Sequence, residues 1–154
     1  MRNELLRKLN TLFPLPRFNE RIEEKGLAEI SKTFCLLVAM GLSQNSQILK
    51  SKAERMTETN KFRYELIYRM ELLWRKLDMI CVKIQSIDFD IIDGVEITDA
   101  MLERTYNHFS ALKSNGDKVV GLLRKLGKSE NSAVESLCSE IDMAADELEK
   151  AIKI

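Results

Sequence analysis

Apolar residues recur every three or four positions along most of this chain, which is the spacing of amphipathic helices. The clearest case is the segment 134–152, in which the apolar positions from Val134 to Ile152 share one helical face. The segment 27–42 follows the same period, and its second half is apolar all round. We therefore expect the helix over 27–42 to be buried on more than one side.

Between residues 43 and 89 the apolar positions alternate steps of four and three, as in the seam of a coiled coil. Two middle members, Asn60 and Arg63, are polar. The pattern predicts either a break or kink near residues 57–60, or one helix of about 60–70 Å that protrudes and pairs with another chain. We treat residues 43–63 as a helical extension. The seam positions are Leu49, Ala53, Met56, Asn60, Arg63, Ile67, Met70, Trp74, Leu77, Cys81 and Ile84.

Residues 1–25 are expected to form an N-terminal helical arm. Pro14 ends its first amphipathic helix, because a proline disfavours the helical conformation in the residue before it. Residues 17–25 are predicted to form a further turn or two, closed by Gly26 in the left-handed conformation that follows many helix ends.

Turn and capping residues divide the second half of the chain. Thr98 or Asp99 is expected to cap a helix over 101–112. The pair Asn115-Gly116 predicts the end of that helix, and Asp117 is expected to cap a separate short helix.

These elements predict an all-α fold of five to seven helices in a single domain over 1–154. A chain of 154 residues is long enough to bury a core without disulfides or metals. We expect a multi-helix bundle with a four-helix core, in which the apolar helix over 66–87 is central and the segments 27–42, 101–112 and 134–152 surround it.

Charge and cysteine content restrict the binding partners and the cellular compartment that we expect for the protein. Lysine plus arginine and aspartate plus glutamate number 24 each, so no global field draws the protein to nucleic acid or to an anionic membrane. The longest nearly uncharged apolar run is about ten residues against the roughly 20 that a membrane span needs, so no span is expected. Three well-separated cysteines without a C-x-x-C pair indicate a reducing, intracellular, cytoplasmic setting.

The sequence contains little chemistry of the catalytic kind. His108 is the only histidine, and a metal site in a helical bundle would need several inward carboxylates with Glu-x-x-His pairs. We therefore expect neither a cofactor nor an enzyme. A third-ranked hypothesis is phosphotransfer or ribonuclease activity that depends on His108, with Arg104 or Lys113 nearby. We favour instead a structural histidine beside Phe109.

The first functional hypothesis is a helical protein-protein interaction module, such as an adaptor, regulator or assembly subunit. Its partner would be another protein or a second copy of the chain, held by burial of helix against helix. The predicted partner-binding residues are Leu49, Ala53, Met56, Asn60 and Arg63.

The alternative is a nucleic-acid-binding regulator, because charge is unevenly placed. Residues 50–76 contain eight basic and four acidic residues, and residues 113–128 contain five basic and one acidic residue. Clustered basic side chains are what phosphate binding requires. Residues 130–153 are acidic, and the opposing interpretation is that complementary faces pack or pair within an oligomer, or that the intermixed Glu and Lys form a solvated face. The candidate residues are Lys50, Lys52, Arg55, Lys61, Lys118, Arg124, Lys125 and Lys128.

Overall fold

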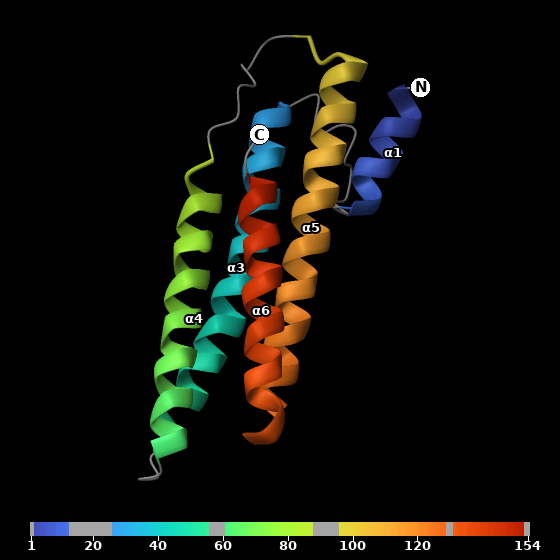
Figure 1. Ribbon diagram of the computed structural model, residues 1–154. Helices are drawn as coiled ribbons and strands as arrows, with labels where there is room; N and C mark the ends of the chain where they lie inside the picture. The colour runs from blue at the N-terminus through green and yellow to red at the C-terminus, as the bar shows by residue number, and fades with distance from the viewer. Residues whose placement is uncertain (1, 13–25, 56–60, 88–95, 129–130, 153–154) are drawn as a thin grey trace.

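The computed structural model describes residues 2–12, 26–55, 61–87, 96–128 and 131–152. These residues form helices and short connections without a strand, so the all-α prediction is confirmed for the described part of the chain (Figure 1). The helices are α1 (Arg2–Leu12), α3 (Leu27–Arg55), α4 (Lys61–Gln85), α5 (Asp99–Lys128) and α6 (Asn131–Ile152).

Helices α3 to α6 form a four-helix bundle in which the chain runs alternately down and up (Figure 1). α3 packs against α4 and α5, and α6 packs against the same two helices, so α4 and α5 occupy opposite corners of a ring. The apolar stripes of the four helices meet on the axis of this ring, where Leu42, Leu77, Leu112 and Leu148 are fully buried. The prediction of a four-helix core is correct. The expectation of one central helix is wrong, because α4 is one member of the ring and packs mainly against α3 and α6.

The arm begins as predicted. α1 lies along α5 and buries Leu5, Leu6 and Leu9. Two contacts fix its ends: the Arg2 guanidinium donates to the Ile97 carbonyl at 2.6 Å, and the Lys113 ammonium donates to the Leu12 carbonyl at 3.1 Å. The expected turn over residues 17–25 lies outside the described residues.

Two predicted local features before α3 and α5 are present. Gly26 precedes α3 with a positive φ of 83°, the conformation that glycine adopts without steric cost. Thr98 caps α5, since its hydroxyl oxygen accepts a hydrogen bond from the Met101 backbone N–H at 3.2 Å.

The segment 43–55 is not an extension of the bundle. α3 continues from Leu27 through Arg55 as one helix of 29 residues and packs on its neighbours over that length. α4 returns alongside it, so the predicted break between the two helices falls at residues 56–60, outside the described part of the chain.

The predicted helix end at Asn115-Gly116 is also wrong. α5 passes through both residues and continues to Lys128, a total of 30 residues or about 45 Å. A glycine there serves close packing: a Cβ atom on Gly116 would lie 3.1 Å from Val38 Cγ1 of α3. The absence of a side chain lets α5 approach α3, and that packing outweighs the low helix propensity of glycine.

Gly116 and Gly121 therefore form a matched pair within α5, since a Cβ atom on Gly121 would meet nothing within 4 Å. We expect Gly121→Ala to raise the free energy of unfolding by about 0.5–1 kcal/mol through helix propensity. We expect Gly116→Ala to raise the free energy of unfolding by less than this, or to lower it, because its methyl group would press on Val38. Urea denaturation of both variants measures the difference, and equal gains would show that Gly116 does not limit the approach of the two helices.

Candidate functional site

The outer surface of α3 and α4 is unexpectedly apolar. Ten large hydrophobic side chains of the described residues are exposed, and nine of them belong to these two helices. The expectation that 27–42 is buried on more than one side is therefore wrong. The exposed set is Leu36, Leu37, Met40 and Ile48 of α3, Tyr64, Tyr68, Leu72, Met79 and Val82 of α4, and Met143 of α6.

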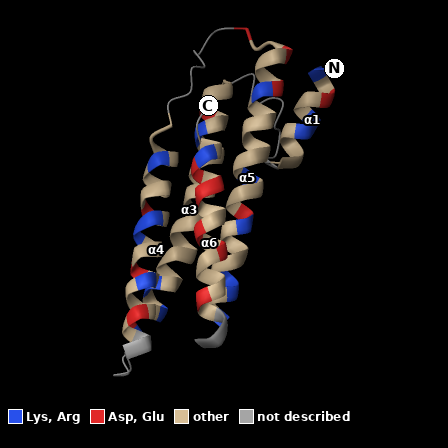
Figure 2. Ribbon diagram, viewed as in Figure 1, with Lys and Arg blue, Asp and Glu red and all other residues tan. Residues whose placement is uncertain are grey.

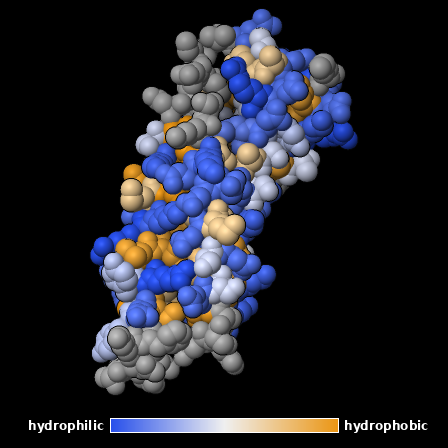
Figure 3. Space-filling view, in the orientation of Figure 1, coloured by the Kyte–Doolittle hydropathy of each residue, from blue (hydrophilic) through white to orange (hydrophobic). Residues whose placement is uncertain are grey.

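The five exposed residues of α4 form a stripe along its outer face, opposite the stripe that fills the core. Their spacing of three, four or seven residues keeps them on one side of the helix. Tyr68 and Met79 are 64 % and 63 % exposed, so most of each side chain is accessible to solvent. Figure 3 shows apolar side chains interrupting the hydrophilic surface on the side of the bundle that α4 forms. We call Tyr64, Tyr68, Leu72, Met79 and Val82 the α4 stripe.

The residues predicted to bind a partner lie elsewhere. Leu49 and Ala53 are 1 % and 5 % exposed and belong to the core of the chain itself. They have almost no surface to offer a partner. Met56 and Asn60 fall outside the described residues, and Arg63 lies in α4 with a side chain that the structure does not describe.

Trp74 is the one tryptophan of the chain and is half-buried between α4 and α3. The Lys50 ammonium lies 4.4 Å from the centre of its ring, a cation–π geometry. Lys50 also lies 4.0 Å from Glu54. Lys50 is thus engaged within the chain and is a weak candidate for a phosphate contact.

Much of the basic charge of α4 is paired with α6, as the opposing interpretation held. Arg69, Lys76 and Lys83 are spaced by seven residues and face acidic residues of α6 (Figure 2). The pairs are Arg69 with Glu135 at 3.6 Å, Lys76 with Asp146 at 2.5 Å, and Lys83 with Glu149.

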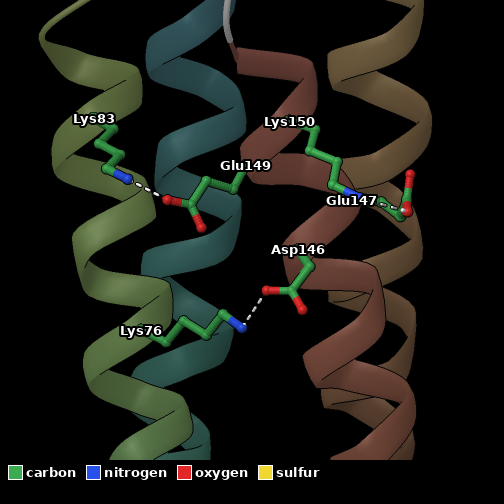
Figure 4. Close-up of polar contacts among 6 residues, drawn as sticks. All are labelled: Lys76, Lys83, Asp146, Glu147, Glu149 and Lys150. Atoms are coloured by element: carbon green, nitrogen blue, oxygen red, sulfur yellow. Dashed lines mark hydrogen bonds and ion pairs between the residues drawn. The ribbon is translucent and has the colours of Figure 1, made fainter.

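These contacts affect the carboxyl groups that make them. The hydrogen bond from Lys76 lowers the pKa of Asp146, and the hydrogen bond from Lys83 lowers the pKa of Glu149 (Figure 4). Both carboxyl groups are solvent-accessible, so the pairs contribute little to stability. Their effect is to neutralise this side of the bundle and to favour α6 as the neighbour of α4.

A second group of basic residues lies where α3 and α5 end side by side. Two adjoining hollows of about 570 and 430 Å³ follow the groove between these helices, and both are lined by Gln44, Ile48 and Gly127. The charged residues that line the hollows are Lys52, Arg55, Arg124 and Lys128, and all four are basic. We call this the α3/α5 groove.

The groove unites half of the predicted nucleic-acid-binding residues, drawn from two segments about 70 positions apart in the sequence. Lys118 and Lys125 are exposed on α5 but do not line it. Lys50 lies beside Trp74, and the Lys61 side chain is not described.

His108 is half-buried between α5 and the end of α6. Burial lowers its pKa, and hydrogen bonding to the backbone of Ile152 and Ala151 acts in the opposite direction. Its Nε2 atom is inaccessible to solvent. A phosphate acceptor or a general acid has to reach a substrate, so this placement favours the structural role over the catalytic one.

The cysteine thiols are equally secluded. All three are buried, and burial raises the pKa of Cys35 to about 12 and that of Cys81 to about 11. The Cys81 thiol lies 3.4 Å from the Ala39 carbonyl of α3. A buried thiol with a raised pKa is a poor nucleophile.

The described residues contain neither a cluster of metal ligands nor a helix that could span a membrane. No group of three or more His, Cys, Asp and Glu side chains there lies close enough together to hold a metal ion. None of the described helices is long and apolar enough to cross a membrane. Among known proteins, no family model matches the chain, and no curated protein or solved structure matches it.

Sequence reasoning missed the α4 stripe, although its signal was present. The apolar residues of α4 occupy two opposite faces, and we assigned both to the core because the helix was expected to be central. A helix in a ring of four has one buried side, so the second apolar face is the feature that indicates a surface for binding.

The placement of His108 predicts a specific dependence of stability on pH. Because its pKa is lower in the folded protein than the ordinary value of 6.5, the unfolded chain binds the additional proton first as pH falls. Its contribution is complete above pH 6.5 and is lost as pH falls through the folded pKa. We expect wild-type protein to lose more unfolding free energy between about pH 7 and about pH 5 than His108→Gln does. Urea denaturation at each pH tests this, and parallel curves would contradict the burial of His108.

Proposed function

We propose that this protein is a non-enzymatic interaction module that binds a helix of a protein partner along the α4 stripe. The observation that carries the proposal is the gathering of exposed apolar side chains along one face of α4, since large apolar patches on the surface of a folded protein mark interaction sites.

The stripe suits a helical ligand. Its residues from Tyr64 to Val82 span 18 positions at 1.5 Å each, or about 27 Å, the length of several helical turns. Their spacing is that of a helix face whose side chains interdigitate with those of a second helix. Two tyrosines lie at one end of the stripe, and tyrosine is enriched among the residues that contribute most to binding at interfaces.

One polar pair lies among the apolar side chains of the stripe. Arg75 lies within it and pairs with Glu71 of the same helix at 3.0 Å. A partner helix that packs along the stripe would therefore have to accommodate this pair within the contact.

Site-specific photo-crosslinking in cells that naturally encode the protein tests the proposal. A benzoyl-phenylalanine replaces Tyr68, and the matched control carries it at Met143, which is 71 % exposed and lies apart from the stripe on α6. We expect one discrete adduct from position 68 and none from position 143. An adduct of twice the chain mass identifies a second copy as the partner, and a different mass identifies another protein. No discrete adduct from folded protein labelled at position 68 would contradict the proposal.

A second variant measures the strength of the contact. Tyr68→Glu with Met79→Glu places two charges in the stripe, and we expect it to abolish the crosslink from a probe at Leu72. Met143→Glu is the control and should leave that crosslink intact. The thermal unfolding midpoint should change little in both, because all three side chains are exposed.

A further inference from the structure

We propose that the α3/α5 groove binds the phosphate backbone of nucleic acid without reading its base sequence. This site is separate from the α4 stripe and does not depend on the function proposed for that stripe. It joins Lys52 and Arg55 of α3 to Arg124 and Lys128 of α5, and among the described residues no acidic side chain lines it.

Three of the four groove cations differ from the basic residues of α4, because they have no acidic partner among the described residues. Arg69, Lys76 and Lys83 all pair with α6. Among the described residues, no carboxylate pairs with Arg55, Arg124 or Lys128. The fold thus neutralises one basic surface and leaves a second one open, and an uncompensated cluster of cations concentrates anions at its surface.

Helix ends explain only part of this cluster. Basic residues in the last turn stabilise the negative end of a helix, and the Lys52 ammonium does so by donating to the Leu126 carbonyl of α5 at 2.7 Å. Arg124 precedes the last turn of α5, however, and the hollow beside it extends up to Gln44, well before the end of α3. The charge therefore belongs to the groove as well as to the helix termini.

The remaining polar lining is suited to phosphate oxygens. The groove presents amide and hydroxyl groups of Gln44, Gln47 and Ser51. These residue types, with arginine and lysine, supply most protein contacts to phosphates and sugars. An acidic peptide is the competing ligand, and the abundance of amide and hydroxyl donors beside the cations favours phosphate over carboxylate.

The lining also predicts how selective the binding is. No aromatic side chain of the described residues lines the groove, so these residues give bases no surface on which to stack. Its apolar part consists of Ile48 and Leu123, and Gly127 lies beside Ile48. Recognition then rests on the backbone, and affinity should fall steeply with salt and be nearly independent of sequence.

Fluorescence anisotropy with a short labelled DNA duplex tests the proposal on the full-length chain. Arg55→Gln with Arg124→Gln removes two cations from the groove. Arg104→Gln with Lys118→Gln, two exposed positions of α5 outside it, removes the same charge and is the control. We expect the groove variant to bind the duplex about tenfold or more weakly. The magnitude of the slope of log K against log salt concentration should fall by about two, and the control should be nearly unchanged in both respects. Arg124→Gln alone, an exposed change within α5, should lower the slope by about one.

Four outcomes overturn the proposal: no binding to the duplex at low salt, equal weakening by both double variants, strong dependence on duplex sequence, or binding to polyglutamate as tight as to the duplex. The last outcome would assign the groove to an acidic protein segment. Unchanged circular dichroism of every variant shows that affinity and not folding is compared. The α4 stripe variant Tyr68→Glu with Met79→Glu should bind the duplex as wild type does, which separates failure of this proposal from failure of the first.

Discussion

The ring of four helices depends on burial of a single apolar stripe from each of α3, α4, α5 and α6. Burial of apolar area is the dominant favourable term in folding, and at about 25 cal/mol per Å² it outweighs the local preferences that would end or bend a helix. Phe34 of α3 and Phe109 of α5 show the result, because their rings stack at 4.2 Å between centroids across the core. The same constraint keeps α5 helical through Gly116, where close packing on Val38 replaces a predicted turn.

A ring also determines which surfaces remain for function. Within the ring each helix has two neighbours, and α1 covers α5 in addition, so apolar residues beyond the buried stripe of α3, α4 or α6 have to face solvent. On α6 the outward and flanking positions are largely acidic and pair with α4. On α4 the outward positions are apolar, and no helix among the described residues covers them. Among the described apolar residues of α4, seven are buried in the core and the five of the α4 stripe are exposed.

The sequence predicted the helices well and their neighbours poorly, for a physical reason. Periodicity identifies a helix and its apolar face, and Thr98 and Gly26 marked boundaries because caps act within a few residues. Periodicity does not reveal which helix covers that face. Leu49 and Ala53 therefore resembled a seam for a partner although α3 buries them within its own chain. The α3/α5 groove was visible only as two basic segments, since the contact of Lys52 with the Leu126 carbonyl depends on the tertiary packing of α3 on α5.

The two proposed surfaces are compatible because α4 and α5 lie at opposite corners of the ring. The α4 stripe faces outward from one corner, and the groove opens between α3 and α5 on the other side of α3. A helix bound along α4 would leave Arg55 and Arg124 accessible, and a nucleic acid in the groove would leave Tyr68 exposed. Coupling between the surfaces would have to pass through α3, whose close contact with α5 at Gly116 leaves little room for sliding. The architecture accordingly favours independent binding at the two proposed surfaces, without a change in the fold of the chain.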